Sequence, residues 1–214
     1  MARPTLLLDI DNVLIRDPTL LGHVKHNVVH YVQQKLPRCK DPERVNQLLY
    51  RTYGHTARGL ESSFRIDASD FDREVYSLKL IKHLWEHLDS PEFQKDAGHV
   101  SDLCESGWDV ILFSNAPLTW SGPVMRAISD KVRVSDGRYL KPEAKAYTAF
   151  PSDKHYIFVD DALTNLMTPK HLYNWTPIHF AEEPTQTMFP TLSSIEGVKT
   201  YCQITQDLAR LNRL

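Results

Sequence analysis

The sequence has 214 residues, of which 42% are hydrophobic and 24% are charged. This composition is typical of a folded globular protein and excludes a disordered or fibrous chain. No run of apolar residues is longer than four, whereas a helix that spans a membrane needs about 20. The length fits one domain with a sizeable insertion.

The charges are nearly balanced, with 25 lysine and arginine residues against 27 aspartate and glutamate residues and a formal net charge of −2. Without a basic cluster, there is no electrostatic case for nucleic acid or a membrane surface as a partner. The first apolar run meets Asp9 and Asp11 at once, so no secretory signal is recognisable and we expect a cytoplasmic protein. The cysteines are odd in number and far apart, which favours reduced core thiols over a disulfide framework. They are Cys39, Cys104 and Cys202.

The first predicted element is a short strand at residues 6–8, followed directly by Asp9 and Asp11. From there to the next strand the sequence predicts helices only, with recognisable start and stop signals. The first helix spans 20–36, and the second begins at Asp41-Pro42. The third runs from a Ser69 cap to Trp85, and the fourth runs from Ser90-Pro91 to Gly107. Parallel strands are usually joined by far fewer residues, so we expect residues 16–90 to form a helical cap over the carboxyl edge of a sheet.

Two later apolar runs resemble the first, because compact polar residues follow each of them at once. They are Val110–Phe113, before Ser114 and Asn115, and Tyr156–Val159, before Asp160 and Asp161. Strands that are apolar throughout are typical of the centre of a parallel sheet, whose carboxyl edge binds ligands. Weaker strand patterns span 176–181 and 198–202. The predicted fold class is therefore α/β, with a Rossmann-like parallel sheet in residues 1–15 and 91–214.

Acidic residues gather where two of the predicted strands end. Asp9 and Asp11 alternate along one strand end and so share a face, while Asp160 and Asp161 end another strand. Carboxylates this close repel one another and raise each other's pKa, so such a cluster favours a hard cation with oxygen ligands. Mg²⁺ is the simplest choice, because it uses few protein carboxylates and keeps several waters.

Other polar residues complete the predicted site. Lys141 is the natural counter-charge to the acidic cluster. Ser114 and Asn115 supply small donors that could bind phosphoryl oxygens.

Four short motifs resemble, in order, those of the haloacid dehalogenase (HAD) superfamily of phosphatases. They are Asp9-Ile10-Asp11-Asn12-Val13, Ser114-Asn115, Lys141-Pro142 and Asp160-Asp161. Each motif is weak alone, but their order, and the apolar strands before three of them, make the resemblance specific.

The resemblance implies a role for each charged residue. Asp9 would attack phosphorus and form an aspartyl-phosphate, and Asp11 would protonate the leaving oxygen and later activate water. The metal ligands would be the Asp9 carboxylate, the Asp11 main-chain carbonyl and the Asp160 carboxylate, with Asp161 acting nearby or through water. Mg²⁺ and Lys141 would neutralise the charges that otherwise keep a carboxylate from attacking a phosphoryl group.

Asp11 favours phosphate-ester hydrolysis over carbon–halogen cleavage. An ester oxygen benefits from a general acid, whereas halide leaves without a proton, and the dehalogenases of the superfamily generally lack an acid at this position. The sequence departs from many members at Asn12 and Val13, where Gly-Thr is frequent. Asn12 can adopt the backbone angles for which glycine is otherwise used.

A narrower resemblance is to the pyrimidine 5'-nucleotidase branch. It rests on residues 9–14, on Tyr53-Gly54-His55-Thr56-Ala57-Arg58-Gly59-Leu60 in the predicted cap, and on Lys141-Pro142 with Lys145-Ala146-Tyr147 and Phe158-Val159-Asp160-Asp161. It implies a nucleoside 5'-monophosphate as substrate. Arg58 could approach its phosphate, ribose or base edge, and Tyr53 could stack on a ring, although a surface or packing role is an equal alternative for both.

Other interpretations remain open or are set aside. The protein could be a phosphatase for another small phosphometabolite, a phosphotransferase, or a catalytically silent subunit of a larger assembly. His83-Leu84-Trp85-Glu86-His87 spells the HxxEH pattern of a zinc peptidase. We reject that interpretation because the helix lies in the predicted cap and no third ligand is apparent.

Overall fold

The computed structural model describes residues 4–183 and 186–211. In chain order its elements are β1 (Thr5–Leu8), α1 (Pro18–Lys35), α2 (Pro42–Tyr53), α3 (Thr56–Phe64), α4 (Phe71–Val75), α5 (Leu78–Leu88), α6 (Pro91–Glu105), β2 (Asp109–Leu112), α7 (Leu118–Ile128), β3 (Arg133–Val134), α8 (Ala144–Thr148), β4 (Tyr156–Asp160), α9 (Leu163–Met167), the 3₁₀ helix η1 (Pro169–His171), β5 (Trp175–Phe180), β6 (Thr191–Leu192) and α10 (Ile195–Leu211).

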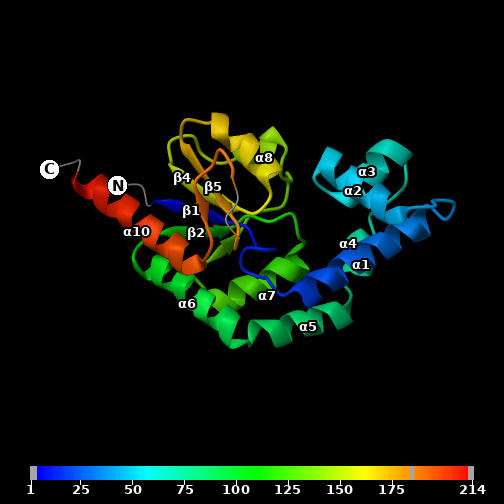
Figure 1. The fold of residues 1–214 in the computed structure, drawn as a ribbon, viewed down its shortest axis with the longest axis horizontal. Coiled ribbons are helices and arrows are strands. Elements are labelled where there is room, and N and C mark those ends of the chain that lie inside the picture. Colours follow the sequence, from blue (N-terminus) through cyan, green and yellow to red (C-terminus); the bar gives the residue numbers. More distant parts are fainter. Residues whose placement is uncertain (1–3, 184–185, 212–214) are drawn as a thin grey trace.

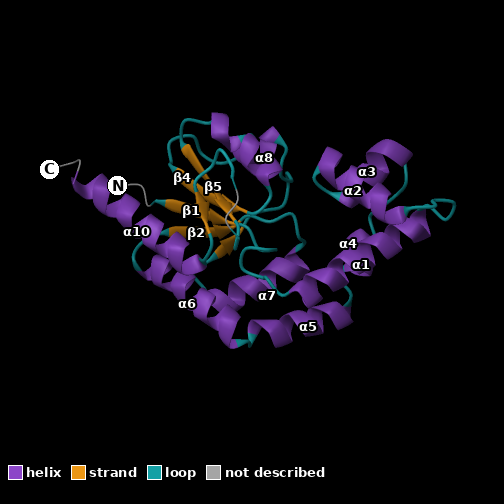
Figure 2. Cartoon of the chain, in the orientation of Figure 1, coloured by secondary structure: helices purple, strands orange, loops and turns teal. Residues whose placement is uncertain are grey.

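The strands form one parallel sheet in the order β3-β2-β1-β4-β5-β6. Leu8 at the end of β1 pairs with Leu112 of β2 and with Val159 of β4. The three strands therefore end at the same level (Figure 2), and the register places the residues that follow them at one edge of the sheet. This is the α/β, Rossmann-like arrangement that the sequence predicts.

Helices cover both faces of the sheet because its strands are apolar on both sides. Leu6 and Leu8 pack into one cluster with α6, α7 and α10, while Leu7 faces the opposite cluster around Tyr147 of α8. Figure 1 shows α6 and α10 on one side of the strands and α8 on the other. The alternation of Leu6, Leu7 and Leu8 between the two clusters follows from the two-residue period of a strand.

Residues 16–90 contain α1 to α5 and, within the described chain, no strand. Helices α1, α2, α3 and α4 share a small apolar core of their own, which includes Tyr31, Leu49, Leu60 and Phe71. Figure 1 shows these four helices as a separate layer beside the sheet. The boundaries of the predicted cap at residues 16 and 90 stay a prediction, and we use the name cap for this segment.

Side chains at the helix starts explain where several helices begin. Asp41 accepts a hydrogen bond from the main-chain N–H of Arg44, and Ser90 accepts one from Phe93. Proline follows each of them, as expected for a first helical residue that needs no N–H partner. The helices predicted to begin at Asp41-Pro42 and at Ser90-Pro91 are therefore confirmed.

Two predicted elements are wrong. Residues 198–202, predicted as a strand, lie within α10, because Val198 and Cys202 are one helical turn apart and both face the core. The single helix predicted from Ser69 to Trp85 is divided into α4 and α5. The break occurs because Ser77 starts a new helix by accepting a hydrogen bond from the N–H of Leu80.

The cysteines are free, as expected, and Cys104 and Cys202 are buried. Cys39 is only half-buried, so its assignment to the core is wrong. It lies between α1 and α2, outside the apolar stripes of both helices. None of the helices in the described part of the chain is long and apolar enough to cross a bilayer.

Candidate active site

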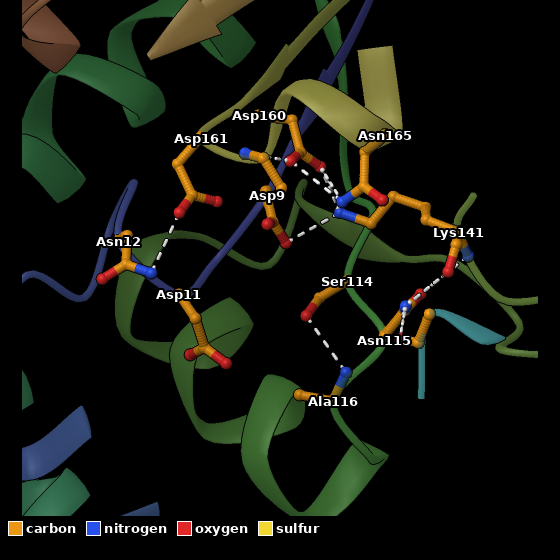
Figure 3. Close-up of polar contacts among 12 residues, drawn as sticks. Asp9, Asp11, Asn12, Ser114, Asn115, Ala116, Lys141, Asp160, Asp161 and Asn165 are labelled. Carbon is orange, nitrogen blue, oxygen red and sulfur yellow. Dashed lines mark hydrogen bonds and ion pairs between the residues drawn. The ribbon is translucent and has the colours of Figure 1, made fainter. Parts of the chain in front are cut away.

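Three loops and strand ends bring opposite charges together at the carboxyl edge of the sheet. Asp9 follows β1, Asp160 ends β4, and Lys141 lies between β3 and α8. Lys141 Nζ lies 3.0 Å from Asp9 Oδ1 and donates a hydrogen bond to Asp160 Oδ2 at 2.5 Å (Figure 3). Because Lys141 is only 1% exposed, its ammonium group depends on these two carboxylates.

Asp160 is held rigidly by further donors. The side-chain amide of Asn165 donates to both of its oxygens, at 3.0 and 3.1 Å, and the main-chain N–H of Ala162 donates to Oδ1 at 2.9 Å. These bonds fix the direction of the carboxylate that faces Lys141 (Figure 3). The sequence interpretation missed Asn165, although its place on the first turn after the Asp160-Asp161 motif was a signal that could have identified it.

Asp9, Asp160 and Asp161 form a cluster with the chemistry of a metal site. Each offers an oxygen, and the three oxygens lie within 4.8 Å of one another. Within residues 4–183 and 186–211 no other three His, Cys, Asp or Glu side chains come this close, and the His83 and His87 pair gains no third ligand. An all-oxygen set of carboxylates suits a hard cation such as Mg²⁺.

The electrostatics of the cluster also fit a cation. Burial raises the pKa of Asp9 to about 6, with Lys141 acting against this and Asp160 adding to it. Burial, followed by the charge of Asp9, raises the pKa of Asp161 to about 7. Burial alone would lower the pKa of Lys141, but Asp160 and Asp9 hold it above its ordinary value. One ammonium group thus leaves the carboxylates only partly compensated, and a bound cation would favour their ionised forms.

Asp11 lies beside the cluster and has a different partner. Its Oδ1 accepts a hydrogen bond of 2.9 Å from the indole Nε1 of Trp120, which is wholly buried on α7. Burial and the nearby Asp9 raise the pKa of Asp11 to about 7, while the Trp120 hydrogen bond acts in the opposite direction. A carboxyl group in this state is able to give and take a proton near neutral pH. The sequence interpretation missed Trp120, because nothing in the sequence distinguishes it from the other apolar residues of α7.

Asn12 takes the backbone conformation expected of it. Its φ is +60°, in the left-handed region where asparagine is tolerated better than most residues. From this position its side-chain amide donates to Asp161 Oδ2 at 3.0 Å. A glycine here would offer the same backbone freedom without that hydrogen bond.

The two polar residues after β2 have different surroundings. Ser114 accepts a hydrogen bond from the N–H of Ala116 at 3.1 Å, which leaves its hydroxyl proton available to an anion. The amide of Asn115 is engaged with main-chain groups of Gly54 and Lys141. Both residues line the same cavity. Their contacts with a phosphoryl group stay predictions.

A cavity of about 440 Å³ extends from the acidic cluster to the cap. At the sheet it is lined by Asp9, Asp11, Ser114, Asn115, Lys141 and Asp161. On the cap side, the lining includes Lys25, Asn46, Gln47, Tyr50, His55, Phe71 and Tyr76. The cavity therefore joins a charged end, suited to a phosphoryl group, to an aromatic end with a few polar groups.

Tyr53 and Arg58 are not among the residues that line this cavity. The Tyr53 hydroxyl accepts a hydrogen bond from Ser63 at 2.9 Å, and its ring packs on the apolar core of the cap. Arg58 forms an ion pair with Glu143, at the start of α8. Their predicted contacts with a substrate stay predictions. The cap residues that do face the cavity, such as Tyr50, lie on helix faces that no motif marks.

Several solved structures of the HAD type are similar to this chain in fold. A HAD phosphatase from Thermococcus onnurineus matches 94% of this chain and 98% of its own, with a TM-score of 0.57 and 14% identity. A Bacillus subtilis protein of the HAD hydrolase type, bound to magnesium, matches over 95% and 99%, with a TM-score of 0.53 and 14% identity. An L-2-haloacid dehalogenase from Xanthobacter autotrophicus matches over 94% and 99%, with a TM-score of 0.52 and 10% identity.

These likenesses establish a HAD-like fold for this chain, in agreement with the sequence prediction. No protein-family model and no curated protein matches the sequence. Because the identities are so low, the reaction has to be argued from the site itself.

Proposed function

We propose that the protein is a Mg²⁺-dependent phosphomonoester hydrolase of the HAD type, acting through an aspartyl-phosphate on Asp9. The observation that carries this proposal is the contact of one buried lysine, Lys141, with both Asp9 and Asp160 beside a third carboxylate. A carboxylate that is to attack an anionic phosphoryl group needs such a concentration of positive charge. The similarity to a HAD phosphatase and to a magnesium-bound HAD protein supports the same assignment.

In the first step, a carboxylate oxygen of Asp9 forms a bond to phosphorus while the bond from phosphorus to the ester oxygen breaks. The proton of Asp11 passes to the departing oxygen, so the alcohol leaves neutral and Asp11 becomes a carboxylate. In the second step, Asp11 takes a proton from water, the water oxygen attacks phosphorus, and Asp9 and inorganic phosphate are released. Lys141 stays protonated throughout and stabilises the charge on Asp9 and the phosphoryl oxygens.

The residues that would hold Mg²⁺ are Asp9, Asp160 and Asp161 through their carboxylates, and Asp11 through its main-chain carbonyl. When bound, the ion would supply charge neutralisation at the phosphoryl group. The three carboxylate oxygens, which lie within 4.8 Å of one another, support Asp9, Asp160 and Asp161 as ligands.

We further propose nucleoside 5'-monophosphates, pyrimidine ones first, as the substrate class. The resemblance of residues 53–60 to pyrimidine 5'-nucleotidases supports it. The cavity adds support, because the rings of Tyr50, Phe71 and Tyr76 could contact a base, and the amides of Asn46 and Gln47 could pair with base edges.

The test is phosphate release from a panel of phosphomonoesters with Mg²⁺ and with chelator. The panel contains pyrimidine and purine 5'-monophosphates, sugar phosphates, a lysophospholipid and an aryl phosphate. We expect metal-dependent hydrolysis, highest on a pyrimidine 5'-monophosphate. Hydrolysis of another ester at a higher rate would refute the substrate class alone. The absence of phosphate release from every ester, with Mg²⁺ present, would refute the hydrolase and favour a silent subunit.

A further inference from the structure

Trp120 is a residue of the apolar core that also contacts the candidate site. Its indole Nε1 donates to Asp11 Oδ1 at 2.9 Å, and its ring is wholly buried. Trp108 is buried in the same apolar cluster, 4% exposed, and its Nε1 has no hydrogen-bond partner. The core therefore accommodates an indole without an acceptor, and the Trp120 hydrogen bond calls for another explanation.

The bond restricts what Asp11 can do, because an indole N–H can only donate. Asp11 Oδ1 must be the acceptor whether or not the carboxyl group carries a proton. The carbonyl oxygen of a carboxylic acid is a better acceptor than its hydroxyl oxygen, so the hydrogen bond to Oδ1 favours a proton on Oδ2. The ring of Tyr76, a residue that lines the cavity, packs against Trp120 with centroids 5.4 Å apart and limits its movement.

The position of Asp11 suits this division of its two oxygens. Figure 3 shows its carboxyl group set apart from the contacts that join Lys141 to Asp9 and Asp160. Asp11 lines the cavity, so a bound ester would lie beside its carboxyl group.

We propose that Trp120 is a positioning residue for proton transfer, holding Oδ1 of Asp11 so that Oδ2 gives the proton to the leaving oxygen. This inference rests on the proposed phosphomonoesterase. The balance of the step is unchanged: the bond from phosphorus to the ester oxygen breaks, a bond from Asp9 to phosphorus forms, and the Asp11 proton ends on the alcohol.

The role predicts a dependence on the leaving group. An alkyl phosphate needs its departing oxygen protonated, whereas p-nitrophenolate leaves readily without a proton. The experiment compares kcat/KM on a nucleoside 5'-monophosphate and on p-nitrophenyl phosphate for the parent, Trp120→Phe and the matched control Trp108→Phe. We expect Trp120→Phe to lower the value on the alkyl ester about tenfold or more beyond any loss on the aryl ester. Trp108→Phe should change both alike.

A second variant covers the case in which Trp120→Phe does not fold. Replacement of Trp120 by benzothienylalanine keeps the shape of the ring and puts sulfur in place of the N–H, and it should show the same selective loss. Equal losses on the two esters, or faster turnover of the alkyl ester, would overturn the inference. A parent protein inactive on both esters would instead overturn the proposed hydrolase, and the role of Trp120 with it.

Discussion

The side chain of Asn115, after β2, donates a hydrogen bond of 3.0 Å to the main-chain carbonyl of Gly54, in the turn between α2 and α3. The same amide donates to the carbonyl of Lys141 at 2.8 Å, and its oxygen accepts from the Lys141 N–H at 2.8 Å. One side chain therefore ties the cap to the segment that carries the buried lysine. Gly54 allows this approach, since its φ is +70° and a Cβ there would collide with the Lys141 carbonyl.

We predict that Asn115→Asp is more harmful than Asn115→Ala. The aspartate would place an oxygen against the carbonyls of Gly54 and Lys141, where alanine only leaves these groups without a partner. We expect urea unfolding to show a loss of about 1–3 kcal/mol for alanine and a larger one for aspartate. An aspartate variant as stable as the parent would show that the hydrogen bonds of Asn115 to Gly54 and Lys141 do not stabilise the fold.

Asp9→Asn should abolish turnover without weakening the fold. A neutral amide cannot attack phosphorus, so we expect phosphate release to fall at least about a thousandfold. Asp9 is ionised at pH 7.5, but burial raises its pKa to about 6, so its charge costs the folded protein stability relative to the unfolded chain. In the absence of metal, the variant should therefore melt at no lower temperature than the parent. Parent-level turnover in a clean preparation would refute Asp9 as the nucleophile.

Mg²⁺ should stabilise the folded protein through the acidic cluster. An ion that binds only the native state adds about 2.7 kcal/mol at a hundred times its Kd. We expect the melting temperature to rise with Mg²⁺ concentration in the parent and to stay nearly constant in Asp160→Asn. Asp207→Asn, which changes an exposed carboxylate on α10, is the matched control and should respond like the parent. An equal rise in all three proteins would point to a general salt effect.

The core of the site was predictable because its residues follow strands. An apolar run that ends in Asp9, or in Asp160, reveals both the strand and the edge at which the side chain emerges. Lys141 follows no strand of that kind, and its assignment depended on the family resemblance. The register of β1 with β2 and β4 then brings the motifs together.

The remainder of the site depends on packing between elements and was not predictable. Trp120 reads as an apolar residue of α7, and only the docking of α7 beside Asp11 gives its N–H a partner. Likewise, Tyr50 faces the cavity because α2 packs on α1 and α3. Hydrophobic periodicity identifies the helices of the cap but does not say which polar residue faces the sheet.

The ion pair of Arg58 with Glu143 allows a test of the predicted substrate contact of Arg58. If the pair serves only to join cap and core, Arg58→Ala and Glu143→Ala should raise KM alike, and the double variant should be no worse than either. Because the pair is partly exposed, we expect each rise in KM to correspond to a free energy of about 0.5–1 kcal/mol. If Arg58 also binds the substrate, Arg58→Ala alone should change the preference among nucleotides. Lys131→Ala, which breaks an exposed pair with Glu105, is the control.

His55 should make the stability of the folded protein sensitive to acid. Burial, followed by the charge of Arg58, lowers the pKa of this histidine from 6.5 to about 4, and its ring packs on Phe71 with centroids 5.0 Å apart. Between these pH values the unfolded chain binds a proton at His55 that the folded chain does not. The contribution of neutral His55 to folding stability is therefore complete above pH 6.5, and it falls as the pH drops towards 4.

The expected size of the His55 effect is at most about 3 kcal/mol. It is measured as the difference in urea-unfolding free energy between the parent and His55→Gln at several pH values from 4 to 7.5. Carboxylates with raised pKa values stabilise the folded state as the pH falls, and because they do so in both proteins, the difference removes their effect. Relative to the glutamine variant, the parent should lose stability as the solution becomes acidic. His26→Gln, at an exposed position on α1, should follow the parent. A constant difference between parent and His55→Gln across this range would show that His55 does not carry the effect.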